Sequence, residues 1–235
     1  MADNRGIVYE SRINKLLKKN KVQKMSFIPA GSDSNAPDAI LTLGTKDYKV
    51  EIKLDAKVDF GQASLDYDVN KKKWSLGGAD TASAIQMREF LDSIGVPKFV
   101  NKKWGPKGAP RKFTIPPAQF KQIDVAHDYK TFKDEFVDIP PSAVADYYNS
   151  KNTYYIQIGG YGLYYMGKDI ANLGVPEFDS KLRLRIRLKR GGSYPIYNYR
   201  FTTAIQAISA SLSKSNSDLE NEEFLKAIKH RMKLK

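Results

Sequence analysis

The sequence contains no cysteine among its 235 residues and only two histidines. Without cysteine the chain forms no disulfide, offers no thiolate nucleophile and cannot build a Cys-rich zinc site, a composition that fits a cytoplasmic protein. His127 and His230 stand far apart, with no partner at the spacing of a metal site or a catalytic triad. This argues against a nuclease with a His-metal finger and against a Ser-His-Asp hydrolase.

Long apolar runs are also missing from the sequence. No stretch approaches the roughly 18 residues that a membrane helix needs, and the N-terminus lacks the apolar segment of a secretory signal. The pattern Gly-x-x-x-x-Gly-Lys-Ser/Thr does not occur, so nothing indicates a nucleotide-driven motor. We therefore expect neither a membrane partner nor a nucleotide cofactor.

Positive charge is what the sequence has in excess. Lys and Arg number 39 against 26 Asp and Glu, which gives a formal net charge of +13. The basic residues recur along the whole chain instead of forming a tail, and this favours contact between a folded surface and a polyanion, nucleic acid before anionic membrane. On charge alone, the alternative is a basic protein with no such partner.

Hydrophobic periodicity predicts a mixture of helices and strands. Helices are expected over residues 5–19, 80–94, 118–137, 141–149, 203–213 and 218–233. Strands are expected over residues 24–29, 39–43, 48–54, 60–76 (as a pair) and 97–100, and residues 153–203 are β-rich. Residues 101–117 are rich in Gly and Pro and predict a loop. This order of elements predicts an α/β (α+β) fold.

The strand predicted at residues 48–54 displays a charged pair from a buried support. Because side chains alternate along a strand, Glu51 and Lys53 share one face while Val50, Ile52 and Leu54 occupy the other. A short turn at residues 44–47 joins this strand to the one before it, which starts after Pro37-Asp38. Hairpin pairing is therefore expected to return Asp38 towards Glu51 and Lys53.

Two carboxylates that converge on one point repel each other unless a cation lies between them. Oxygen ligands of this kind suit Mg²⁺, which keeps several waters and takes further oxygens from phosphate. A lysine beside them could orient an attacking water or hold a phosphate oxygen, and these groups suffice to hydrolyse a phosphodiester. The alternatives are an exposed cross-strand charge pair for Glu51 and Lys53 and a turn-capping role for Asp38.

The segment from Pro37-Asp38 to Glu51-Ile52-Lys53 resembles the motif of the PD-(D/E)XK nuclease superfamily. The resemblance implies that Asp38 and Glu51 are metal ligands, that the carbonyl of Ile52 is a further ligand and that Lys53 is the catalytic lysine. It implies Mg²⁺ as cofactor, with Mn²⁺ expected to substitute. It also implies a restriction-endonuclease-like core with a mixed central sheet flanked by helices, built from a helix, a three-strand meander, a helix and a further strand. The elements predicted over residues 5–100 follow that order.

Two further candidates for the catalytic site come from the same resemblance. Many members of the superfamily carry a glutamate on the helix before the first core strand, and Glu10 stands there. Some relatives use a glutamine beyond the catalytic strand, where this chain has Gln62. The alternatives are a solvated helix glutamate that pairs with Asn14 or Lys18 and an ordinary polar strand residue.

The clearest binding signal outside the motif is the segment 181–190, KLRLRIRLKR. As a strand it buries one face and presents Arg183, Arg185, Arg187 and Lys189 on the other, where four like charges favour a polyanion as counter-charge. An exposed row of cations on a solvated sheet is the alternative. The loop after residue 100 adds further candidates for contact with DNA, namely Lys102, Lys103, Lys107, Arg111 and Lys112.

Together these features predict an Mg²⁺-dependent endonuclease that acts on double-stranded DNA, of restriction or homing type before junction resolvase. Residues 1–100 are expected to form the nuclease core, and residues 101–235 a basic, β-rich extension that grips DNA. Because a double-strand cut needs two active sites, a homodimer is a natural arrangement. The rival interpretation is a non-catalytic DNA-binding protein with a nuclease-like core.

Overall fold

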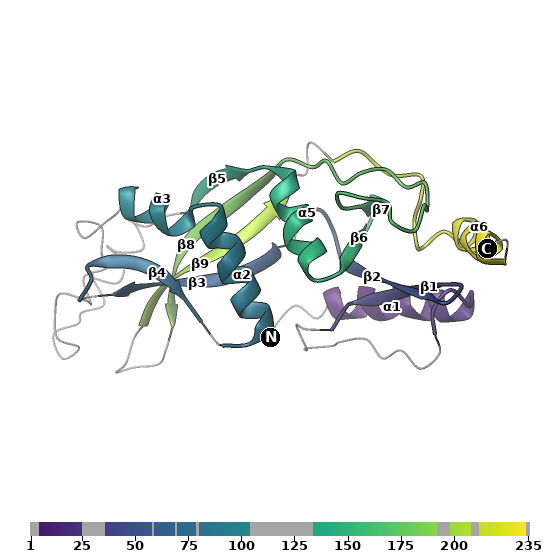
Figure 1. Ribbon diagram of the computed structural model, residues 1–235, viewed down its shortest axis with the longest axis horizontal. Helices are drawn as coiled ribbons and strands as arrows, with labels where there is room; N and C mark the ends of the chain where they lie inside the picture. The colour runs from purple at the N-terminus through teal and green to yellow at the C-terminus, as the bar shows by residue number, and fades with distance from the viewer. Residues whose placement is uncertain are drawn as a thin grey trace. The chain divides into compact units, whose positions relative to one another are not determined.

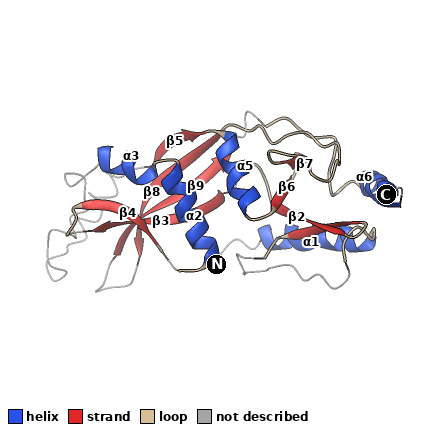
Figure 2. Ribbon diagram, in the orientation of Figure 1, coloured by secondary structure: helices blue, strands red, loops and turns tan. Residues whose placement is uncertain are grey.

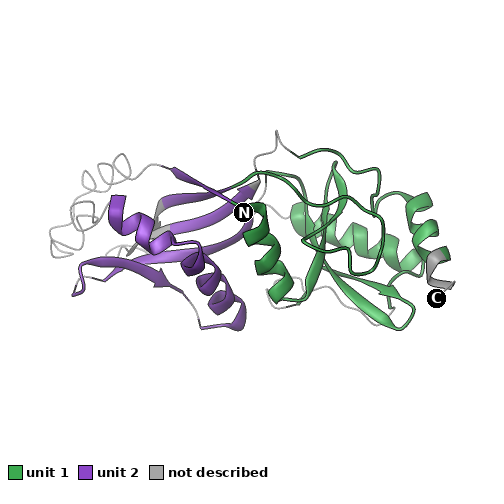
Figure 3. Ribbon diagram, turned by 45° about the horizontal axis from the view of Figure 1, so that its top comes forward, with its two compact units in different colours: residues 1–58, 140–182, 207–235 green, residues 59–139, 183–206 purple. Residues whose placement is uncertain are grey.

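The computed structural model describes residues 5–24, 36–57, 59–68, 70–78, 80–103, 134–191, 198–207 and 212–233. The chain divides into two compact units (Figure 3), and neither is continuous in sequence. The first unit comprises residues 1–58, 140–182 and 207–235, and the second comprises residues 59–139 and 183–206. The second unit is thus inserted into the sequence of the first as two segments, and the earlier of these segments contains the boundary predicted at residue 100.

The first unit is built on a four-stranded mixed sheet with the order β1-β2-β6-β7 (Figures 1 and 2). The strands β1 and β2 form an antiparallel hairpin, β6 lies parallel to β2, and β7 returns antiparallel to β6. The elements of this unit are α1 (Arg5–Lys19), β1 (Ala39–Leu43), β2 (Lys46–Lys53), α5 (Pro141–Ser150), β6 (Thr153–Ile158), β7 (Gly162–Tyr165) and α6 (Glu222–Lys233).

The core of the first unit lies on the face of the sheet to which Val50 and Ile52 point. Tyr9, Ile13 and Leu17 of α1 pack against them, because these residues recur every three or four positions and form one apolar side of the helix. Leu225 and Ile228 of α6 are buried in the same core. Glu51 and Lys53 consequently project from the opposite face of the sheet.

The second unit contains a five-stranded sheet with the order β4-β3-β9-β8-β5. Its antiparallel pairs include β3 with β4 and β3 with β9. Helices α2 and α3 accompany this sheet (Figure 2), and the side chain of Thr81 caps the first turn of α2. The elements are β3 (Asp59–Asp68), β4 (Lys73–Gly77), α2 (Ala82–Ser93), α3 (Val96–Lys103), β5 (Glu135–Ile139), β8 (Leu182–Gly191) and β9 (Asn198–Ala207).

The mixed α/β class is confirmed, but the third strand beside the hairpin was assigned wrongly. The predicted order of elements implied a meander of β1, β2 and the first strand of the pair predicted at residues 60–76, whereas β3 pairs with β4 and β9 in the second unit. The neighbour of β2 is the parallel strand β6, which is preceded by α5. Parallel strands need a long crossover connection, usually helical, and here the connection also carries most of the second unit.

Three local assignments were also wrong. Residues 97–100 belong to α3, because Pro97 is tolerated in the first turn of a helix and Val96 and Val100 bury one face. Residues 203–207 form part of β9, where pairing with β3 overrides the local preference of an alanine-rich segment for helix. Residues 135–137 are in β5, not in a helix. Residues 25–29 and 118–133 lie outside the described part of the chain.

Candidate active site

The hairpin of β1 and β2 determines where the two motif carboxylates stand. Ala39 pairs with Val50, and a two-residue turn at Gly44-Thr45 closes the hairpin. One step further along the same register, Asp38 comes opposite Glu51. The predicted hairpin and the approach of Asp38 to Glu51 are therefore confirmed, but the turn is shorter than the one predicted at residues 44–47, because Lys46 and Asp47 belong to β2.

Glu51 and Lys53 form a close ion pair on the sheet face opposite the core. The distance from Lys53 Nζ to Glu51 Oε1 is 2.6 Å, and each side chain keeps 17% exposure. Burial acts to lower the pKa of Lys53, but the carboxylates of Glu51 and Asp38 outweigh it and raise the pKa, so the amine is a cation. The pair is thus a half-buried charge arrangement and not a solvated surface pair.

Asp38 is held by the strand that carries the ion pair. The backbone N–H of Ile52 donates to Asp38 Oδ2 at 2.8 Å. Burial and the negative charge of Glu51 raise the pKa of Asp38 to about 7, against the opposing effects of Lys53 and the Ile52 N–H. A carboxyl group with so high a pKa carries its charge readily only when a further cation is close.

One oxygen of each carboxylate is engaged by the protein. Lys53 and the hydroxyl of Tyr148 both contact Oε1 of Glu51, while Oδ2 of Asp38 accepts the Ile52 N–H. Within the described residues, the other oxygen of each carboxylate, Oε2 and Oδ1, has no hydrogen-bond donor. These two oxygens come from residues opposite each other in the hairpin and are the ones available to a cation.

The carbonyl of Ile52 points to the same side of β2 as Asp38. The N–H and C=O groups of one strand residue point the same way, and those of the next residue point the other way. The N–H of Ile52 reaches Asp38, and the carbonyl of Lys53 instead accepts the N–H of Gly159 beyond β6. Two carboxylates and a carbonyl fit Mg²⁺, which takes one or two carboxylates and completes its shell with water and phosphate. No group of three His, Cys, Asp or Glu side chains suited to a metal occurs in the described residues.

Glu10 of α1 lies within electrostatic range of this pair. The pKa of the Glu10 carboxyl is raised above its ordinary value. Burial is the largest cause and the charge of Glu51 adds to it, while the charge of Lys53 opposes them. Asn14, which is 3% exposed, donates from Nδ2 to the carbonyl oxygens of Glu10 at 2.9 Å and Asp38 at 2.8 Å. One buried amide therefore ties the helix that carries Glu10 to the start of β1.

Sequence reasoning missed the roles of Asn14 and Tyr148. A signal for Asn14 was present, because it stands beside Ile13 on the apolar side of a helix, where a polar residue needs partners. Tyr148 had no local signal: it belongs to a tyrosine-rich stretch of the kind that usually fills sheet interfaces. Its hydroxyl nevertheless contacts Glu51 across 97 positions of the chain.

The remaining predicted residues belong to the second unit. Gln62 is exposed on β3, and its catalytic role stays a prediction. Lys102 and Lys103 are exposed at the end of α3, where Lys103 pairs with Glu135. Lys107, Arg111 and Lys112, and the side chain of Lys189, lie outside the described part of the chain.

The alternation predicted for β8 is confirmed, since Leu182, Leu184 and Ile186 are buried. Three arginines on the other face, Arg183, Arg185 and Arg187, are called the arginine row below. Arg185 pairs with Asp59, Arg187 pairs with Asp134, and the Arg183 guanidinium lies 3.8 Å from the ring centroid of Phe136. The protein thus supplies counter-charges to two members of the row, and a role in DNA contact stays a prediction.

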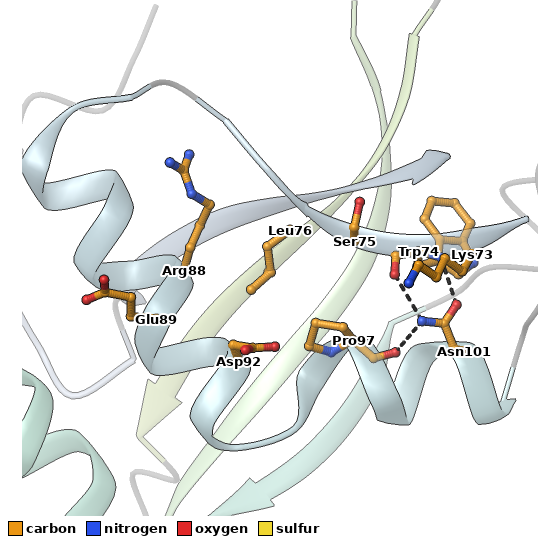
Figure 4. Close-up of a pocket in the computed structure, with 9 residues that line it drawn as sticks. All are labelled: Lys73, Trp74, Ser75, Leu76, Arg88, Glu89, Asp92, Pro97 and Asn101. Atoms are coloured by element: carbon orange, nitrogen blue, oxygen red, sulfur yellow. Dashed lines mark hydrogen bonds between the residues drawn. The ribbon is translucent and has the colours of Figure 1, made fainter. Parts of the chain in front are cut away.

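The second unit contains a hollow of about 430 Å³ that none of the predicted site residues lines (Figure 4). At one end Asn101 of α3 accepts the N–H of Trp74 and donates to the carbonyl oxygens of Trp74 and Pro97. These bonds tie α3 to β4. The hollow is lined by Lys73, Trp74, Ser75, Leu76, Arg88, Glu89, Asp92, Pro97 and Asn101, and so by none of the predicted site residues.

No protein-family model matches the chain, and no curated protein matches it. Among solved structures, HhaI endonuclease in complex with DNA is similar, with a TM-score of 0.50 over 96% of this chain and 98% of that chain. This chain has a restriction-endonuclease-like fold. The sequence identity is 13%, so the likeness concerns the fold alone. In the described residues, no helix combines the length and the apolar character needed to cross a membrane.

Proposed function

We propose that this protein is an Mg²⁺-dependent endonuclease that hydrolyses phosphodiester bonds of double-stranded DNA. The observation that carries the proposal is the cluster of Asp38, Glu51 and Lys53 on one hairpin. The cluster belongs to a chain with a restriction-endonuclease-like fold, and a solved structure of similar fold is described as an endonuclease in complex with DNA. The motif and the fold therefore support the same activity by separate routes.

Each member of the cluster has a distinct task in the proposed reaction. Asp38, Glu51 and the carbonyl of Ile52 would hold Mg²⁺, and the carboxylate of Glu10 adds negative charge within electrostatic range of Lys53 and Glu51. When bound, the cation supplies Lewis-acid stabilisation of the charge that develops on the phosphate. The Lys53 ammonium can hold a phosphate oxygen or orient the attacking water, because it is charged and anchored beside Glu51.

The second unit is the better candidate for grip on the DNA backbone. Its sequence carries 19 Lys and Arg against 11 Asp and Glu. Phosphate contacts of such basic residues supply most of the sequence-independent affinity for DNA. Restriction or homing specificity is preferred over junction cleavage, and two copies of the chain would give the two active sites of a double-strand cut.

The proposal is tested by incubating plasmid DNA with the purified protein in Mg²⁺, in Mn²⁺ and in EDTA. Nicking or cutting with either metal and not in EDTA is expected. Lys53→Ala should lower the cleavage rate by about a hundredfold or more, because it removes a group that acts on the developing charge. DNA affinity, measured in Ca²⁺ by mobility shift, should stay close to that of the wild type.

Lys49→Ala is the matched control for this variant. Lys49 lies on the same face of β2, and its Nζ contacts the carbonyl oxygen of Lys151 instead of a site carboxylate. Its loss should leave the cleavage rate almost unchanged. Normal cleavage by Lys53→Ala would remove this cluster from the mechanism. A wild-type protein that binds DNA and cuts no form of it would establish the non-catalytic alternative.

A further inference from the structure

Tyr148 of α5 contacts the catalytic strand from the sheet face that carries Glu51. The side chain is 1% exposed, and its hydroxyl donates to Glu51 Oε1 at 3.3 Å. The ring meets that of Tyr147 edge-on, with centroids 5.2 Å apart and an interplanar angle of 65°. Helix α5 leads into β6, which pairs with β2 through Glu51 and its neighbours. The packing of α5 against its neighbours therefore positions the Tyr148 hydroxyl beside Glu51.

Both donors to Glu51 meet the same oxygen. Lys53 Nζ lies 2.6 Å from Oε1, and the Tyr148 hydroxyl reaches Oε1 as well. A single donor leaves a carboxylate free to turn about the bond to its neighbouring carbon, whereas two donors from different directions restrict its plane. Neither donor bonds to Oε2. Groups that hold a metal-ligating side chain in this way tune metal affinity without touching the metal.

We infer that Tyr148 is a positioning residue that holds Glu51 with Oε2 turned towards the divalent cation. This inference rests on the proposed function, because it assigns Glu51 the role of a metal ligand. It accounts for the placement of a buried hydroxyl beside an ion pair, where a phenylalanine would fill the same space. It also makes α5, an element outside the sequence motif, part of the active site.

The test compares Tyr148→Phe with Tyr155→Phe. Tyr155 is the matched control because it is also buried, and its hydroxyl donates to a carboxylate outside the site, Asp169, at 2.6 Å. Both variants lose one phenol–carboxylate hydrogen bond and keep the ring, and Tyr155→Phe also loses the bond that its hydroxyl accepts from the Ala171 N–H. A purely structural role would therefore give the two variants the same phenotype, which is a fall in thermal stability alone.

Two measurements separate the roles: the Mg²⁺ concentration for half-maximal plasmid cleavage, and Ca²⁺ affinity by calorimetry without DNA. Tyr148→Phe should weaken both by about tenfold, the lower end of the effect of removing a group that supports a metal ligand. Its cleavage rate at saturating Mg²⁺ should stay within about twofold of the wild type, because the chemical groups remain. Tyr155→Phe should leave both metal measurements unchanged.

The possible results distinguish the inference from the function on which it rests. If the wild type cuts DNA and Tyr148→Phe has the same Mg²⁺ and Ca²⁺ dependence, the inference is overturned and the nuclease activity stands. If Tyr148→Phe lowers only the saturated rate, Tyr148 acts in the chemical step and the positioning role is also overturned. A wild type that neither binds Ca²⁺ nor cuts DNA overturns both.

Discussion

Replacing Asp38 with Asn should stabilise the metal-free protein at neutral and alkaline pH while abolishing cleavage. The pKa of Asp38 is about 7 in the folded protein, against an ordinary value of 3.8. The folded state therefore binds this proton more tightly than the unfolded state, and ionisation of Asp38 lowers stability as the pH rises from about 4 to about 7. Asparagine cannot ionise, and its Oδ1 can still accept the N–H of Ile52.

The size of this effect follows from the two pKa values. Their difference sets an upper limit of about 4 kcal/mol for the stability that Asp38 loses when it ionises above pH 7. The half-buried carboxyl group keeps some contact with water, which screens the charges around it and reduces this loss. We therefore expect Asp38→Asn to gain about 1 to 2 kcal/mol at pH 8 and to gain almost nothing at pH 4.

Urea unfolding in EDTA at several pH values measures the free energy of unfolding of the variant and of the wild type. The difference between the two removes the contributions of titrating groups that both proteins share. Asp47→Asn is the control with the opposite sign. The pKa of Asp47 is lowered by its contacts with Lys24 and Thr42, so its charge stabilises the fold above pH 4, and its removal should lower stability at pH 8. If Asp38→Asn instead loses stability at pH 8, as is expected for Asp47→Asn, the conclusion that burial and Glu51 destabilise the charged form of Asp38 is refuted.

Two further predictions concern the fold and the DNA surface. Gly159→Ala should destabilise the first unit by about 2 to 3 kcal/mol, because a Cβ there would come 2.1 Å from the backbone oxygen of Leu54. Thermal unfolding measures this loss. The control is Gly6→Ala, where nothing lies within 4 Å of the added Cβ and little change is expected. Replacing the arginine row with Gln should reduce the slope of log DNA affinity against log salt by about 0.9 for each phosphate contact removed. An unchanged slope would show that the contacts within the second unit occupy these arginines in the complex too.

Local sequence determined the parts of the site that are close in the chain. Alternation placed Glu51 and Lys53 on one face of β2, and the short turn at Gly44-Thr45 determined that Asp38 stands opposite Glu51. The apolar repeat of α1 defined residues 5–19 as a helix with the bounds that the structure has. In each case the interactions join residues a few positions apart, so the pattern of side chains specifies the geometry.

The tertiary structure alone decided which strand lies beside β2 in the sheet of the candidate site and which side chains support its carboxylates. The pairing of β2 with β6 joins Glu51 to Ile156, and no periodicity within either strand distinguishes this neighbour from β3. Long-range packing also brings the hydroxyl of Tyr148 to Glu51 and brings two carboxylates to the arginine row. In each case the partners are far apart in the chain. Such contacts depend on which apolar surfaces pack against each other when the chain folds. The packing of the whole chain determines this, and no local pattern specifies it.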